Sequence, residues 1–164
     1  MAVYSTIYTI NKQGPMPTLG KNKKARFDYE ILDTLEAGLV LTGQEVKSLR
    51  TGNIRMAGSY VTFHKNTPQL TNLHIPKYKY ASNIADYDPE RSRAILLKKK
   101  EIAYLRGKSQ EKGLTIIPLS VYTKGRKIKM EIGIARGKKQ FDKRQTIKKR
   151  EQDREDRRMF KGGL

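Results

Sequence analysis

The clearest pattern in the chain is a strict alternation of apolar and polar residues over positions 127–134. Every second residue from Ile128 to Ile134 is apolar, and a period of two predicts a half-buried β-strand whose apolar side faces a core. The opposite side of this strand then carries Lys127, Lys129, Glu131 and the bare backbone of Gly133.

Other segments also have the pattern of strands. The alternation over 27–31 continues with the same parity at Leu39 and Leu41, so we expect one long strand with a bulge near Gly38. Shorter strand-like runs cover 60–63, 70–75 and 114–122. Pro118 lacks an amide proton, which predicts an edge strand or a bulge in the last of these.

Two helical segments are predicted between the strands. Thr42 and Glu45 have the spacing of a capping box, so 43–50 should be a short helix. Asp88 followed by Pro89 is typical of a helix start and predicts helical residues from there to about Leu105, as one helix or two. Short strands with inserted helices and no βαβ rhythm favour a mainly β fold, an OB-like small β-barrel.

Charge points to the kind of partner. The 164 residues include 35 Lys and Arg against 16 Asp and Glu, a formal net charge of +19, which favours nucleic acid first and an anionic membrane surface second. No apolar run approaches the roughly 20 residues of a membrane span, and the N-terminus lacks the pattern of a secretory signal. The chain has no cysteine, so we expect a cytoplasmic protein without disulfides, and no membrane partner.

The chain divides into three expected parts. Residues 1–20 lack a lasting helical or strand pattern and are interrupted by Gly14, Pro15, Pro17 and Gly20, so we expect a mobile N-terminal arm. An OB-like RNA-binding barrel (21–136) and a basic C-terminal tail (137–164) follow. Lysines and arginines gather at 21–26, at 91–100 and in the tail, and Lys23, Lys24 and Arg26 are candidate RNA contacts. The tail has too few apolar residues to pack on a core, so we expect it to stay disordered until a polyanionic partner orders it.

The sequence offers little to an enzyme. His64 and His74 are the only histidines, and neither has the spacing of a metal ligand. No glycine-rich phosphate loop is present, and most of the acids that could form a metal-dependent nuclease fit structural roles better, such as Glu45 and Asp88 as helix caps. We therefore predict no catalytic site, no metal and no cofactor.

Aromatic residues lie within or beside the basic stretches: Tyr78, Tyr80, Tyr87 and Phe141. Bases can stack on such rings while cations neutralise phosphates. The alternative for each tyrosine is a partly buried ring with its hydroxyl in water.

Five segments together resemble the SsrA-binding protein family, also called small protein B (SmpB). They are NKKARFDY (22–29), LEAGLVLTGQEVKSLR (35–50), the stretch from Asp88 to Arg93 with Leu96 and Leu97, the stretch from Gly113 to Tyr122, and GIARGKKQFDKR (133–144). The resemblance implies an OB-like barrel that holds the tRNA-like domain of transfer-messenger RNA. It also implies that the tail enters the small ribosomal subunit of a stalled 70S ribosome and becomes helical in the vacant mRNA channel, beyond the decoding centre. The expected function is trans-translation, in which the ribosome is rescued and the nascent chain tagged.

By position, the resemblance assigns RNA contacts to Glu36, Leu96 and Lys129, and the alternation of the strand adds Gly133. An acid at position 36 is unexpected beside phosphates, but a carboxylate can accept from a base amino group or hold a neighbouring Lys or Arg. Two broader alternatives stay open, a generic OB-fold RNA chaperone or ribosomal protein and a metal-dependent nuclease.

In the tail, Phe141 occupies a position where other members carry His or Tyr, and Gln152 one where an aromatic is common. An aromatic plane for stacking is therefore retained at 141, whereas one apolar contact is weakened at 152. The residues expected to contact the ribosome are Gly137, Lys138, Lys139, Phe141, Asp142, Lys143, Arg144, Ile147, Lys148, Lys149, Arg150, Met159 and Phe160.

Overall fold

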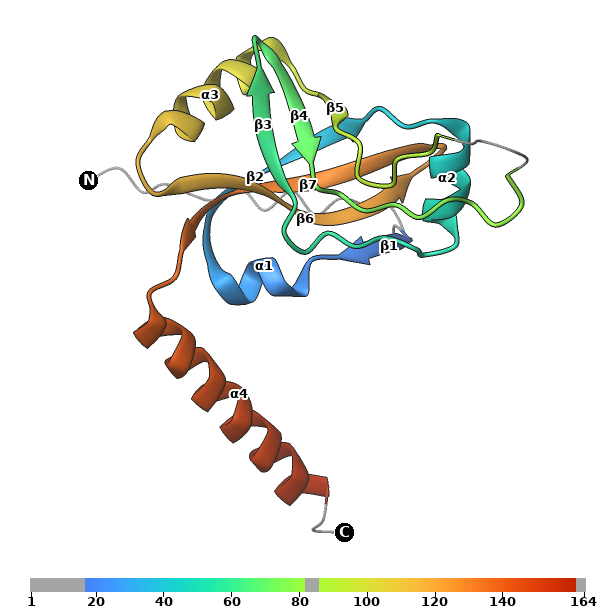
Figure 1. Cartoon of the computed structure of the whole chain (residues 1–164). Helices are drawn as coiled ribbons and strands as arrows, with labels where there is room; N and C mark the ends of the chain where they lie inside the picture. The colour runs from blue at the N-terminus through green and yellow to red at the C-terminus, as the bar shows by residue number, and fades with distance from the viewer. Residues whose placement is uncertain (1–16, 82–85, 162–164) are drawn as a thin grey trace.

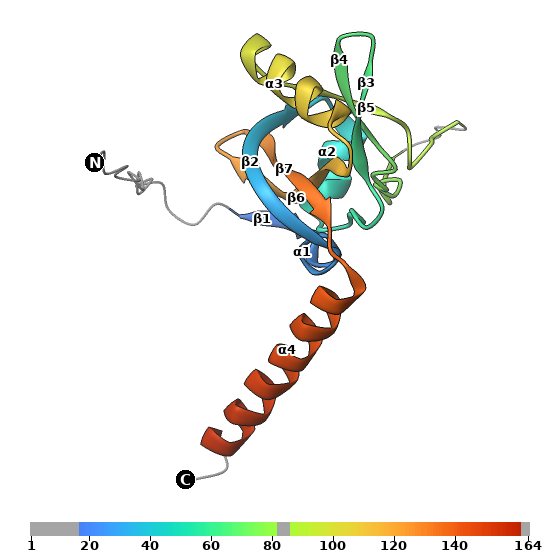
Figure 2. The same ribbon diagram turned by 90° about the vertical axis from the view of Figure 1, so that its left-hand side faces the viewer.

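The computed structural model describes residues 17–81 and 86–161. In chain order its elements are β1 (Thr18–Lys21), α1 (Lys23–Asp28), β2 (Tyr29–Leu39), α2 (Gly43–Arg50), β3 (Tyr60–His64), β4 (Thr67–Thr71), β5 (Arg93–Leu96), α3 (Lys99–Gln110), β6 (Leu114–Lys124), β7 (Lys127–Gly137) and α4 (Gln140–Lys161). The strands form one antiparallel sheet in the order β1-β6-β7-β2-β5-β4-β3. Figures 1 and 2 show the sheet strongly curled, with α4 projecting away from it. We call the part from β1 to β7 the β domain.

The main core lies on the concave side of the sheet. Met130 and Ile132 of β7 are fully buried there, which confirms the strand predicted from the alternation. Leu49 from α2 and Leu105 from α3 are also fully buried, so both helices are held by one apolar face each. The capping box of α2 is present as predicted.

A second, smaller apolar cluster lies on the outer side of the sheet, beneath α1. It is built from Ala25, Ile117, Leu119 and Ala135, with Tyr29 and Ile31 packed against it. Gly133 is buried in this region, where an added Cβ would lie 2.9 Å from Leu119 Cδ1. The prediction that Gly133 presents a bare backbone to a ligand is therefore wrong, because hydrophobic side chains cover it.

In β2 and β6, apolar residues of one parity in the sequence pack into both clusters, which lie on opposite faces of the sheet. Two register shifts explain this. The pairing of β2 with β7 shifts between Ile31 and Asp33, and that of β6 with β7 shifts between Pro118 and Ser120. Each bulge moves the following residues to the other face. The bulge expected near Gly38 thus lies earlier, and Pro118 marks a bulge rather than an edge, since β6 pairs with β1 and β7.

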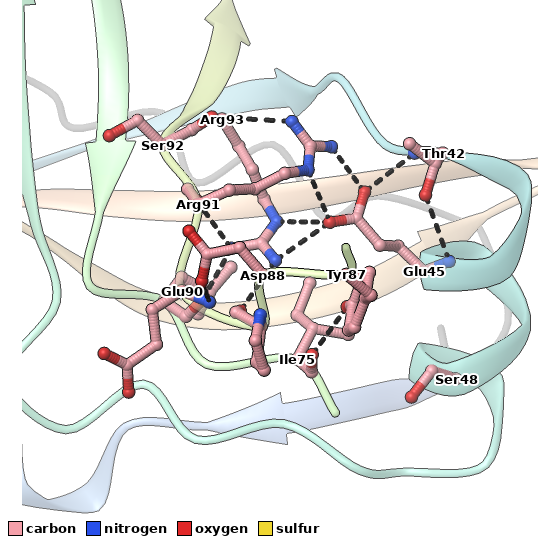
Figure 3. A network of polar contacts seen from close by, with 12 residues as sticks. Thr42, Glu45, Ser48, Ile75, Tyr87, Asp88, Glu90, Arg91, Ser92 and Arg93 are labelled. Carbon is pink, nitrogen blue, oxygen red and sulfur yellow. Dashed lines mark hydrogen bonds and ion pairs between the residues drawn. The ribbon is translucent and has the colours of Figure 1, made fainter. Parts of the chain in front are cut away.

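The helix predicted from Asp88 to Leu105 is also corrected. Asp88 Oδ1 accepts a hydrogen bond from the Glu90 amide in a turn, but the chain then extends into β5, and α3 begins at Lys99. The cause is Arg93, whose guanidinium is fully buried and hydrogen-bonded to Glu45 of α2 (Figure 3). A long-range ion pair has overridden the local signal.

Both ends of the chain differ from expectation. Residues 18–20, assigned to the mobile arm, belong to β1, while residues 1–16 lie outside the described part. The helix α1 occupies 23–28, where the start of a strand was expected, and the Asn22 side chain caps it by accepting from the Ala25 amide. The tail forms the 22-residue helix α4 in the chain alone, rather than waiting for a partner.

Candidate nucleic-acid interface

Three neighbouring strands bring a polar group together on the outer face of the sheet. Tyr122 of β6 pairs with Lys129 of β7, which in turn pairs with Gly38 of β2. Residues opposite one another share a face, so Tyr122 and Lys129 point outward together, and Glu36 joins them because it precedes Gly38 by two.

Glu36 is the centre of this group. Its carboxylate accepts a hydrogen bond from the Tyr122 hydroxyl at 2.6 Å and from Lys124 Nζ at 3.1 Å, and Lys129 Nζ lies 3.6 Å from Oε1. The Tyr122 hydrogen bond and the two lysine charges hold the pKa of Glu36 below its ordinary value, although partial burial acts in the opposite sense. The acid therefore positions two lysines, one of the two roles considered for it.

A hollow in the surface lies beside this group. It is lined by Thr34, Leu35, Glu36, Leu96, Leu97, Lys98, Glu101 and Lys129. Leu96 is 62% exposed, so it presents an apolar surface next to charged groups. Gly38 lets it lie close to β2, since an added Cβ there would meet Leu96 Cβ at 3.1 Å. The three positions assigned by resemblance, Glu36, Leu96 and Lys129, thus line one hollow.

The basic residues of α1 approach the same face from its other end. Arg26 is exposed, and its Nη2 lies 3.9 Å from the carboxylate of Glu131, which follows Lys129 by two on β7. Lys23 and Lys24 are exposed on the same short helix. A phosphate backbone running from the hollow toward α1 would meet cations along its length.

Sequence reasoning missed Tyr122 and Lys124 as members of the site. Part of their signal was present, since Tyr122 ends the strand predicted over 114–122 and Lys124, two residues beyond it, has the same parity. What the sequence lacked was the pairing of β6 with β7 and the bulge after Pro118, which together decide that Tyr122 faces outward.

The tail leaves the β domain beside α1. The Lys138 amide donates to the Asp28 carbonyl at 2.9 Å, and Lys143 Nζ lies 3.0 Å from Asp28 Oδ1. Beyond this first turn the helix extends away from the β domain (Figure 2). The tail residues Lys139, Phe141, Asp142, Arg144, Ile147, Lys148, Lys149 and Met159 are exposed, Gly137 ends β7, and the side chains of Arg150 and Phe160 lie outside the described part.

The aromatic candidates Tyr80 and Tyr87 differ in their surroundings. Tyr87 is structural, because its hydroxyl donates to the Ile75 carbonyl at 2.6 Å, whereas Tyr80 is exposed. Within residues 17–81 and 86–161, no three His, Asp or Glu side chains gather as a metal ion would require. No helix in these ranges is both long and apolar enough to cross a membrane.

Comparison with known proteins adds the following. The family model "SmpB protein" matches residues 19–162. An SsrA-binding protein of Leuconostoc mesenteroides is 49% identical over 150 residues, covering 92% of this chain and 97% of that one. The SsrA-binding protein of Magnetococcus marinus is 48% identical, with 87% and 95% covered. A solved structure described as "tmRNA-SmpB: a journey to the center of the bacterial ribosome" contains a chain with a TM-score of 0.63 and 47% identity, covering 73% of this chain and 84% of that chain.

Proposed function

The chain belongs to the SmpB family of SsrA-binding proteins, and on that premise we propose which of its surfaces perform the family's function. The protein binds transfer-messenger RNA (SsrA RNA) and acts with it in trans-translation on stalled bacterial ribosomes. The β domain, an OB-like barrel, holds the tRNA-like domain of that RNA. The protein works by binding in the cytoplasm and catalyses no reaction.

The hollow beside Glu36 is the centre of the RNA interface. The observation that carries this assignment is that Glu36, Leu96 and Lys129 line it together although they come from three different strands. Leu96 offers an apolar contact to a base or sugar, and Lys124 and Lys129 are held by Glu36 as cations for phosphates. The carboxylate keeps both amines in place, which reduces the entropy lost when RNA binds.

The helix α4 reads the ribosome in this proposal. Its cations would lie against rRNA phosphates of the small subunit, in the mRNA channel beyond the decoding centre. The exposed ring of Phe141, at 67%, is available to stack on a ribosomal base. An occupied mRNA channel would exclude the helix, so only a stalled ribosome admits the complex.

The proposed function is tested by the RNA that the protein retains in cells. The full chain is purified with its bound RNA, and the RNA is sized. One dominant, long, structured species supports the assignment. A broad smear would instead favour a general RNA chaperone, and shortening of labelled RNA in magnesium would favour a nuclease.

The affinity for RNA should depend strongly on salt. Contacts between lysine or arginine and phosphate release counterions, and the outer face offers Lys124, Lys129, Lys23, Lys24 and Arg26. On the order of five such contacts predicts binding weaker by about a hundredfold or more at 200 mM than at 50 mM salt. The dissociation constant, measured by filter binding across this range, checks the slope. A flat response would contradict an electrostatic interface.

Lys129→Ala should weaken binding of transfer-messenger RNA by about tenfold, the cost of one charged contact of about 1–2 kcal/mol. The fold should be little affected, because a partly exposed ion pair contributes at most about 1 kcal/mol. The matched control is Lys127→Ala on the same face of the same strand, outside the hollow, which should lose less. Equal losses for the two variants would mean that general charge, and not the hollow, determines binding.

A further inference from the structure

A pair of tyrosines stands on the surface in the connection between β4 and β5. We call residues 77–81 the tyrosine turn. The ring centroids of Tyr78 and Tyr80 are 5.6 Å apart at an interplanar angle of 66°, an edge-to-face arrangement. Tyr80 is 76% exposed, so most of its surface is uncovered in the chain alone. This exposed ring does not belong to the hollow beside Glu36, because that hollow is lined by residues of other elements.

Two lysines stand over these rings. Lys47 Nζ, from α2, lies 5.8 Å from the centroid of Tyr78, and Lys79 Nζ lies 5.7 Å from that of Tyr80. Both distances are within the range of cation–π attraction. The aromatic surface is therefore bordered by positive charge contributed from two separate parts of the chain.

The turn is held firmly at its base. Ser48 Oγ donates to the Pro76 carbonyl at 2.7 Å, the Tyr87 hydroxyl donates to the Ile75 carbonyl, and the Ala81 amide closes the turn on the Tyr78 carbonyl at 3.0 Å. Close by, Arg93 Nη2 donates to the Pro89 carbonyl at 2.9 Å, which ties the end of the same connection to the Glu45 network (Figure 3). A surface fixed in this way loses little conformational entropy on binding.

The chemistry of this surface fits an unpaired nucleotide. A base supplies a planar face to stack on Tyr80, and the phosphates on either side of it would meet Lys47 and Lys79. An apolar protein surface would have to desolvate both ammonium groups without pairing them, which is costly. The net charge of +19 favours the same ligand.

We propose that the tyrosine turn is a second RNA contact of this protein, where an unpaired base stacks on Tyr80 and the neighbouring phosphates meet Lys79, at the Tyr80 ring, and Lys47, at the Tyr78 ring. This inference rests on the proposed function only in taking RNA as the ligand. The turn and α2 supply this contact, whereas β2, β5, β7 and α3 supply the hollow. The RNA would thus be held at two places, which fixes its orientation as well as its affinity.

The test compares the wild-type chain with Tyr80→Ala, Tyr80→Phe and Tyr60→Ala in equilibrium binding of the tRNA-like domain of transfer-messenger RNA. Loss of one stacked base predicts binding weakened by about fivefold to a hundredfold for Tyr80→Ala. Tyr80→Phe keeps the ring and should bind within about twofold of wild type. Tyr60→Ala removes another exposed ring, on β3, and should also bind within about twofold.

Two further measurements separate stacking from charge and from misfolding. Tyr80→Ala should leave the slope of log affinity against log salt unchanged, whereas Lys79→Ala should reduce it by about one. The thermal unfolding midpoints of Tyr80→Ala and Lys79→Ala should match that of the wild-type chain. The inference is overturned if Tyr80→Ala binds as tightly as wild type, or if Tyr80→Phe loses as much as Tyr80→Ala. Failure of wild type to bind the RNA would instead overturn the proposed function.

Discussion

Glu45→Ala is expected to destabilise the β domain by about 3–5 kcal/mol, a large part of the 5–15 kcal/mol typical of a domain. Glu45 is fully buried, and its carboxylate accepts hydrogen bonds from Arg93 Nε at 2.8 Å, from Arg91 Nε at 2.9 Å and from the Thr42 amide (Figure 3). Alanine would leave the fully buried Arg93 guanidinium without its counter-charge. Equilibrium unfolding in urea measures the loss.

Glu101→Ala is the matched control for this change. Glu101 occupies the same position in α3 that Glu45 occupies in α2, and it accepts from the Lys98 amide at 2.8 Å, but no arginine binds it in the described part. We expect it to cost less than about 1 kcal/mol, as a partly exposed capping contact. Similar losses for Glu45→Ala and Glu101→Ala would show that the buried arginine pair contributes nothing beyond the cap.

The same carboxylate makes stability depend on pH in acid. Burial alone would raise the pKa of Glu45, but the hydrogen bond from Arg91, the Thr42 amide and the charge of Arg93 outweigh it and lower the pKa. A lowered folded-state pKa stabilises the fold above the unfolded value of about 4.3, and this contribution disappears as the pH falls through the folded-state pKa. Glu45→Gln should therefore flatten the acid limb of the stability profile.

Deletion of residues 140–164 is expected to abolish tagging of nascent chains on stalled ribosomes while leaving most of the affinity for transfer-messenger RNA. Among the described side chains, the ion pair that joins α4 to the β domain is that of Lys143 in its first turn with Asp28, worth at most about 1 kcal/mol. The hollow beside Glu36 contains no residue of α4. RNA affinity and tagging activity, measured on the same truncated protein, test this separation.

Replacing Asp142, Lys143 and Arg144 with alanine should give a milder form of the same separation, because the rest of the helix and its charge remain. Its thermal unfolding should match that of the full chain. A truncation that lost RNA binding and tagging to the same extent, or neither, would mean that α4 does not act as an independent ribosome-binding element.

Local signals predicted the elements that local interactions determine. The helix α2 follows from Thr42 and Glu45, and β7 from the alternation around Met130. The helix α1 also had a local signal, since Asn22 is a preferred capping residue, but the alternation at 27–31 concealed it. The strand β5 had no local signal, because its position depends on the hydrogen bond between Arg93 and the carboxylate of Glu45, 48 residues away.

Several residues of the candidate site could be predicted from the sequence, but their arrangement in space could not. Lys129 follows from strand parity, and Glu36 and Leu96 follow only from the resemblance. The role of Glu36 in holding Lys124 and Lys129 requires the pairing of three strands. Gly133 shows the opposite case, since alternation alone placed it outward and could not foresee the cluster beneath α1 that covers it.

The helix α4 also has a mechanical consequence. Its 22 residues, at about 1.5 Å of rise each, make a rod of about 33 Å that is fastened to the β domain at one end. A tilt of about 10° at that end moves the far end by about 6 Å, more than one helical turn. At the start of α4, a Cβ added to Gly137 would meet no atom within 4 Å, and Asp28 forms an ion pair with Lys143 in the first turn of the helix. If α4 binds the ribosome as proposed, a change of a few degrees in the angle at this end would therefore change which part of the ribosome the far end reaches.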